Sequence, residues 1–193
     1  MENNLISRLM EITSTAAIYC ADIENCREKT QKNFVKEMLQ SLPKLYLDFS
    51  DPELDLGEND EYFTAYVDEN QYNEVRGHLE SLLGEHDVFL ETFEEDMKYS
   101  DTPVAASISE SLADIYQALF NFVAIVRDTD GESIEGAYKE CRENFVSYWS
   151  QTLCNVQRAL NHLYYNVELQ DTAEGINDVQ DYSGPEDVDF ELI

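Results

Sequence analysis

The chain has 193 residues, 43% of them hydrophobic, and carries 41 acidic against 12 basic residues, a formal net charge of −29 at pH 7. This length and hydrophobic content suit one domain with a packed core. The negative field argues against nucleic acid and anionic membranes as partners, and no apolar run is long enough to span a membrane. We therefore expect a protein partner, with monomer and homodimer both open.

The four cysteines (Cys20, Cys26, Cys141 and Cys154) form no C-x-x-C motif and lack the spacing of a zinc site. The first twenty residues read as an amphipathic helix, not as a signal peptide. Both observations favour a reduced, cytoplasmic protein, although a secreted protein with two disulfides stays open.

The first predicted helix has apolar residues at helical spacing from Leu5 to Ile23, and a second carries them from Phe34 to Leu45, with a kink expected at Pro43. Residues 48–69 follow, with nine acids and no Lys or Arg, and predict an irregular connection.

Asp68 and Gln71 have the spacing of a capping box for a third helix, and Gly84 suits its end. Asp87 then predicts the N-cap of a short helix reaching to about Met97.

Ser107 and Glu110 form a second capping box, so we interpret Glu110 as a helix cap. The helix that follows carries an apolar stripe as far as Val126, and Asp114 is expected on its solvent side.

The longest predicted helix runs from about Ile134 to Val167 and is apolar over much of its circumference, which predicts a central position. The fold class is therefore all-α: a bundle of about five main helices, with residues 1–169 as a single domain. Residues 170–193 hold eight acids and no basic residue, and we interpret them as an acidic, flexible tail.

Known metal and catalytic patterns are absent from the sequence. None of the three histidines has a Glu three residues before it, as a di-iron bundle requires. Helical metal phosphohydrolases hold an adjacent His-Asp pair within a helix, but the pair His86-Asp87 follows a predicted helix stop. No Gly-rich phosphate loop or nucleophilic triad is visible. We predict no cofactor, no catalytic residue and no metal site.

Two hypotheses about function remain. The first is a non-catalytic binding or regulatory module that recognises a protein through an acidic and aromatic groove. Its predicted contact residues are Asp96, Tyr99, Asp101, Asp114, Tyr116 and Trp149. The alternative is a hydrolase that holds a divalent metal on facing helices. Its predicted ligands are Glu91, Glu94, Asp96 and Asp114.

Four blocks of sequence carry a family resemblance: "MLQSLPKLYL", "LLGEHDVFLETFEEDMKYSDTP", "SISESLADIYQALFNF" and "ENFVSYWSQTLCNVQRALNHLYY". They resemble the bacterial domain-of-unknown-function family 5063 over residues 5 to 165. The resemblance implies a bacterial, single-domain, mainly helical protein without a known cofactor. Members of that family usually carry Gly where Ser150 stands and His where Asn161 stands.

Overall fold

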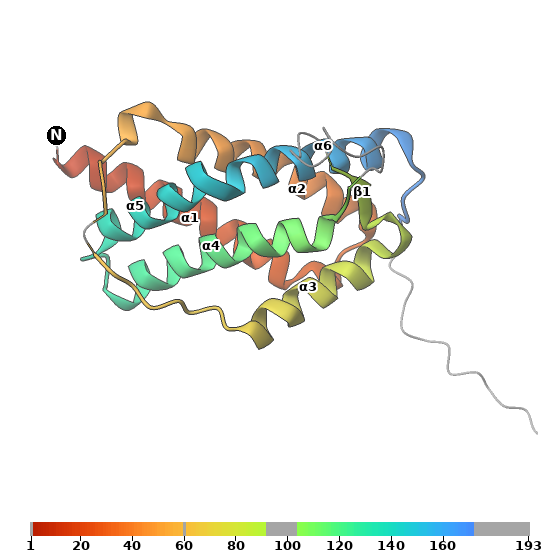
Figure 1. Cartoon of the computed structure of the whole chain (residues 1–193), viewed down its shortest axis with the longest axis horizontal. Coiled ribbons are helices and arrows are strands. Elements are labelled where there is room, and N and C mark those ends of the chain that lie inside the picture. Colours follow the sequence, from red (N-terminus) through yellow and green to blue (C-terminus); the bar gives the residue numbers. More distant parts are fainter. Residues whose placement is uncertain (1, 60, 92–103, 172–193) are drawn as a thin grey trace, which may run out of the picture.

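A computed structural model describes residues 2–59, 61–91 and 104–171 of the chain. Its main helices run along the long axis of the molecule (Figure 1). The helices are α1 (Glu2–Glu24), α2 (Gln31–Ser50), α3 (Glu69–Leu83), α4 (Ile108–Asp128), α5 (Ile134–Asn144) and α6 (Ser150–Asn166). The predicted helical bundle is confirmed, and α4 lies at its centre, in contact with α1, α3, α5 and α6.

Side-chain caps fix where two of the helices begin, as their sequences predict. The Asp68 carboxylate accepts a hydrogen bond from the Gln71 amide at 2.8 Å, and the Ser107 hydroxyl accepts one from the Glu110 amide at 3.1 Å. Gly84 ends α3 with a φ of +55°, a backbone conformation that residues with a Cβ rarely adopt. Helix α2 does not end at Pro43 but continues through it as far as Ser50.

An aromatic cluster fills the core between α2, α4 and the C-terminal helices. The Phe49 ring lies with its centroid 5.1 Å from that of Trp149 and 5.5 Å from that of Tyr138. The Trp149 and Phe145 centroids are 4.5 Å apart. All four rings are buried, and one continuous set of buried apolar residues extends from Leu9 to Leu169. The described residues thus share one core.

The long C-terminal helix predicted from Ile134 onward is present, but one of its turns is not α-helical. The chain passes from α5 through a π-helical turn, Phe145–Trp149, into α6. A π turn holds one residue more than the α-helical turn it replaces, and such turns are frequent at functional sites. Within this turn, Tyr148 is exposed, whereas the next residue, Trp149, is fully buried.

A small antiparallel sheet stands where a short helix was expected. Strand β1 (Val88–Leu90) pairs with β2 (Ala105–Ser107), with Val88 opposite Ser107. The prediction of a helix from Asp87 is wrong over Val88–Leu90, and residues 92–97 lie outside the described part. Asp87 does cap a helix, but it is α4: its carboxylate accepts hydrogen bonds from the Ser109 amide and hydroxyl, both at 2.7 Å.

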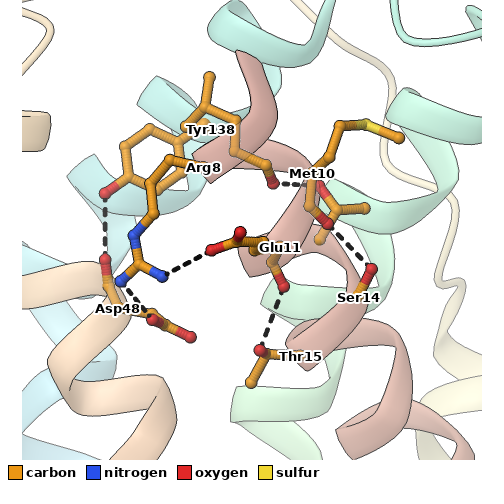
Figure 2. Close-up of polar contacts among 9 residues, drawn as sticks. Arg8, Met10, Glu11, Ser14, Thr15, Asp48 and Tyr138 are labelled. Atoms are coloured by element: carbon orange, nitrogen blue, oxygen red, sulfur yellow. Dashed lines mark hydrogen bonds and ion pairs between the residues drawn. The ribbon is translucent and has the colours of Figure 1, made fainter. Parts of the chain in front are cut away.

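The buried residue Asp48 on α2 connects to α1 through its carboxylate and to α5 through its backbone carbonyl (Figure 2). Asp48 is 4% exposed, and its Oδ1 accepts a hydrogen bond from Nη2 of Arg8 at 2.9 Å. The Asp48 carbonyl oxygen accepts a hydrogen bond from the Tyr138 hydroxyl at 3.3 Å, and Arg8 also pairs with Glu11 at 3.3 Å. Charge compensation by Arg8 therefore lets this acid remain in the bundle interior.

The acidic connection between α2 and α3 is mostly irregular, as predicted, but it is fastened to the bundle. Leu54 and Val67 are buried, and the backbone amides of Tyr66 and Val67 both donate to Oδ1 of Asn121 on α4. Among the described residues, no helix has the length and apolarity needed to cross a membrane.

Candidate binding cleft

A polar cleft of about 430 Å³ opens between the start of α4, the small sheet and the beginning of α6. Among the described residues, its lining has three acids and several hydroxyl and amide groups, and none of these lining residues is Lys or Arg. The lining residues are Glu91, Ala106, Ser107, Glu110, Ser111, Asp114, Val146, Ser147, Tyr148, Ser150, Gln151, Thr152 and Asn155.

Two tyrosine hydroxyls hold the Asp114 carboxylate at the wall of this cleft. Tyr72 on α3 donates to Oδ1 at 2.7 Å, and Tyr148 in the π-helical turn donates to Oδ2 at 2.5 Å. Asp114 is half-buried, so it does not project freely into solvent as the sequence predicted. Each carboxylate oxygen can accept more than one hydrogen bond, so the cleft side of Asp114 keeps acceptor capacity.

The two tyrosines of this triad stay neutral, because the pKa of each hydroxyl is raised. Partial burial and the hydrogen bond to Asp114 raise the pKa of Tyr148 to about 12. The same causes raise the pKa of Tyr72 well above its ordinary value. Both phenols therefore remain protonated donors at neutral pH, and they orient the carboxylate without cancelling its charge.

The other two acids lie on either side of the α4 N-terminus. Glu110 is exposed in the first turn of α4, and within the described residues its carboxylate has no hydrogen-bond or ion-pair partner, so its prediction as a helix cap is wrong and Ser107 alone of that pair caps α4. Glu91 follows strand β1 and accepts a short hydrogen bond from the buried Asn155 amide of α6. The cleft thus has one oriented acid, one solvent-facing acid and one acid already engaged with α6.

The structure separates the six predicted contact residues into three groups. Asp114 lines the cleft. Tyr116 and Trp149 are fully buried, and the Tyr116 hydroxyl donates to the exposed Glu24 of α1 at 2.8 Å. Their prediction as surface contacts is therefore corrected: both are core residues, because rings at helical spacing on α4 and the C-terminal helix face the bundle axis. Asp96, Tyr99 and Asp101 lie outside the described residues.

Sequence reasoning missed most of the polar lining of the cleft. Tyr148 lines the cleft and donates to Asp114, but it is not among the six predicted contact residues. Tyr72 gave no signal, because it lies 42 positions from Asp114 in the chain. Ser147, Ser150 and Thr152 are common residue types on a helix surface, so their gathering depends on the tertiary fold.

The predicted metal ligands meet only in part. Glu91 and Asp114 line the same cleft, whereas Glu94 and Asp96 lie outside the described residues. Across residues 2–59, 61–91 and 104–171, no three His, Cys, Asp or Glu side chains are grouped to hold a metal ion.

The family model of DUF5063, a domain of unknown function, matches residues 5–166. The chain belongs to this family. The match covers every helix from α1 to α6 almost completely, and so includes all the elements that line the cleft. This chain differs from the usual family residues at two positions. Ser150 lines the cleft, whereas Asn161 is exposed on α6.

A solved structure shares this fold. The crystal structure of protein BF1032 from Bacteroides fragilis is similar to the DUF5063 chain, with a TM-score of 0.68 and 31% sequence identity. The similarity covers 82% of this chain and 93% of the Bacteroides chain. No curated protein shows significant similarity to the chain.

Proposed function

We propose that this DUF5063 protein is a non-catalytic cytoplasmic binding module whose cleft accepts a basic side chain from a protein partner. The carrying observation is the composition of the cleft: Glu91, Glu110 and Asp114 line a space of about 430 Å³ to which residues 2–59, 61–91 and 104–171 contribute no Lys or Arg. A lysine or arginine side chain has only donors to offer, and the lining supplies acceptors. The free state of all four cysteines supports the cytoplasmic assignment.

The oriented carboxylate favours binding with little rearrangement. Asp114 is already held by Tyr72 and Tyr148, so a cationic group meets an acceptor whose rotamer is fixed before association. The net charge of −29 adds long-range attraction for a basic partner, which raises the rate of encounter and weakens with salt.

A peptide-binding titration tests this proposal. The probe is a fluorescein-labelled glycine-rich peptide with three lysines or arginines, and its counterpart carries norleucine at the same places. We expect only the basic peptide to raise its fluorescence anisotropy at about 0.15 M salt, where general charge attraction is largely screened. The variant Asp114→Asn should bind about ten-fold more weakly, in line with the loss of one charge-assisted hydrogen bond.

A matched variant separates the cleft from the overall negative charge. Glu132 is exposed just beyond the opposite end of α4, so Glu132→Gln removes one charge far from the cleft. We expect it to bind as the unchanged protein does. Equal losses in Asp114→Asn and Glu132→Gln would mean that the peptide senses only net charge, and the cleft would be rejected as its site.

The metal-dependent hydrolase predicts a different response. Both hypotheses use Glu91 and Asp114 in the same cleft. The kind of ligand that binds, and not the position of the site, therefore distinguishes the hydrolase from the binding module. A tight metal site stabilises the folded state according to the ratio of metal concentration to Kd. A large rise in Tm with Mg²⁺, Mn²⁺ or Zn²⁺ that is lost in Asp114→Asn would favour the hydrolase over the binding module.

A further inference from the structure

An apolar groove of about 390 Å³ lies on the other side of α6, where that helix packs against α2. It is lined by Pro43, Tyr46, Leu47, Leu153, Cys154 and Gln157. Leu47 is 69% exposed and Tyr46 38% exposed, so apolar surface remains uncovered by the described residues. Uncovered apolar surface gathered in a hollow is typical of a docking site.

The C-terminal end of the described chain lies at one end of the helix pair that forms this groove. After α6, Leu169 is buried, and the carbonyl oxygen of Gln170 accepts a hydrogen bond from the Lys32 amide at 3.3 Å. Asp171 forms an ion pair with Nζ of Lys32 at 2.8 Å. Residues 172–193 therefore begin at the first turn of α2.

One stripe of α2 connects this anchor to the groove. Lys32, Lys36, Pro43 and Leu47 are spaced by four, seven and four residues, which places them on one side of a helix. Lys36 is exposed, and within the described part of the chain it forms no ion pair. The stripe thus offers a positive charge between the bound Asp171 and the apolar groove.

The sequence of residues 172–193 is complementary to that stripe. It contains seven acids and no Lys or Arg, and it ends in D-V-D-F-E-L-I, residues 187–193. In an extended chain, alternate side chains point to opposite faces, so Val188, Phe190 and Leu192 would share one face. The distance from Lys32 to Leu47 along α2 is about 22 Å, which seven or so extended residues span.

We propose that the C-terminal segment of this chain binds back along α2, with Val188, Phe190 and Leu192 in the α2–α6 groove and its acids against Lys36. The groove is then a docking surface for the chain's own end, separate from the acidic cleft. A partner that uses the same groove must displace this segment first.

The thiol of Cys154 provides a direct readout. It lines the groove and is exposed, whereas Cys20, Cys26 and Cys141 are buried. The experiment measures the rate at which Ellman's reagent modifies the native full-length chain. We expect the double variant Phe190→Ser/Leu192→Ser to react about ten-fold faster at Cys154, because its thiol becomes accessible. Lys36→Gln should give a smaller increase.

Two controls decide the outcome. Val179→Ser changes an apolar residue of the same segment that lies outside residues 187–193, where acidic and apolar residues alternate. It should leave the rate of Cys154 modification unchanged. The protection should also be independent of protein concentration, as an intramolecular contact requires. An unchanged rate in Phe190→Ser/Leu192→Ser overturns the proposal. Protection that increases with protein concentration overturns it in favour of a second copy in the groove.

Discussion

Asp48 and Asp114 show two ways in which this bundle accommodates a carboxylate. Asp48 is almost fully buried and is compensated by the guanidinium of Arg8, so little of its charge acts outside the molecule. Asp114 is half-buried and is held by the neutral hydroxyls of Tyr72 and Tyr148 at the wall of an open cleft. The first arrangement neutralises a charge, and the second orients one. An acid of the second kind is suited to meet a cation from outside.

The largest expected effect comes from removing the cation of the first arrangement. Arg8→Met leaves Asp48 buried without its counter-ion, which we expect to lower the free energy of unfolding by about 2 kcal/mol. The loss stays below that of a fully enclosed pair, because the Arg8 side chain is 39% exposed and the site is partly screened. Urea denaturation monitored by Trp149 fluorescence measures it.

A second substitution checks the cause of that loss. In the double variant Arg8→Met/Asp48→Asn the buried group is neutral, so we expect part of the stability to return. If the double variant is as unstable as the sum of its single changes, the effect of Arg8 is packing and not charge compensation.

The next effect concerns Asp87, an acid held by neutral donors but closed off from solvent. Asp87→Ala removes two hydrogen bonds to Ser109 at the start of α4 and should cost about 1.5 kcal/mol of unfolding free energy. Ser109→Ala removes only the hydroxyl donor and should cost less. Urea denaturation compares the two variants. Equal losses of unfolding free energy would show that the hydrogen bond from the Ser109 amide to Asp87 contributes nothing.

Asp114→Asn should have a smaller effect on folding. The asparagine side chain keeps its shape and one acceptor oxygen for the tyrosines, so we expect the free energy of unfolding to change by less than about 1 kcal/mol. The larger effect expected for this variant is on binding of the basic peptide. A loss of unfolding free energy as large as that of Arg8→Met would show that Asp114, like Asp48, mainly stabilises the fold.

The smallest effect appears in alkaline solution. The pKa of Tyr148 is raised in the folded protein to about 12, from about 10 for an ordinary tyrosine. A raised pKa contributes stability that is fully present below pH 10 and is lost as the pH rises through 12. Unfolding free energies of the unchanged chain and of Tyr148→Phe should therefore converge over this interval. A constant difference across it would show that Tyr148 ionises as it does in the unfolded chain.

Local sequence signals were sufficient to predict much of the fold. The caps at Asp68 and Ser107 and the stop at Gly84 depend on residues within a few positions of each other, and all three are confirmed. Apolar periodicity likewise predicted the buried sides of the helices. These features are encoded within one helical turn or one stripe.

Contacts between distant residues were not predictable in the same way. Arg8 and Asp48 are 40 positions apart, and Asp87 caps a helix that begins 21 residues later. Strands of three residues, as at Val88–Leu90, carry almost no periodicity and form only because a partner strand is adjacent. Of the cleft residues, Asp114 and Glu91 were singled out from the sequence as candidates, whereas the serines are ordinary residues of a helix surface.

The π-helical turn at Phe145–Trp149 sets the phase between the two halves of the C-terminal helix. If the same residues were wound as an uninterrupted α-helix, all of α6 would be rotated by about 100° relative to α5. Leu153, Val156 and Leu160 would then leave the core, while the serines and threonine that border Asp114 would turn away from it. The extra residue of the π-helical turn therefore keeps the apolar side of α6 in the core and its polar side along the cleft.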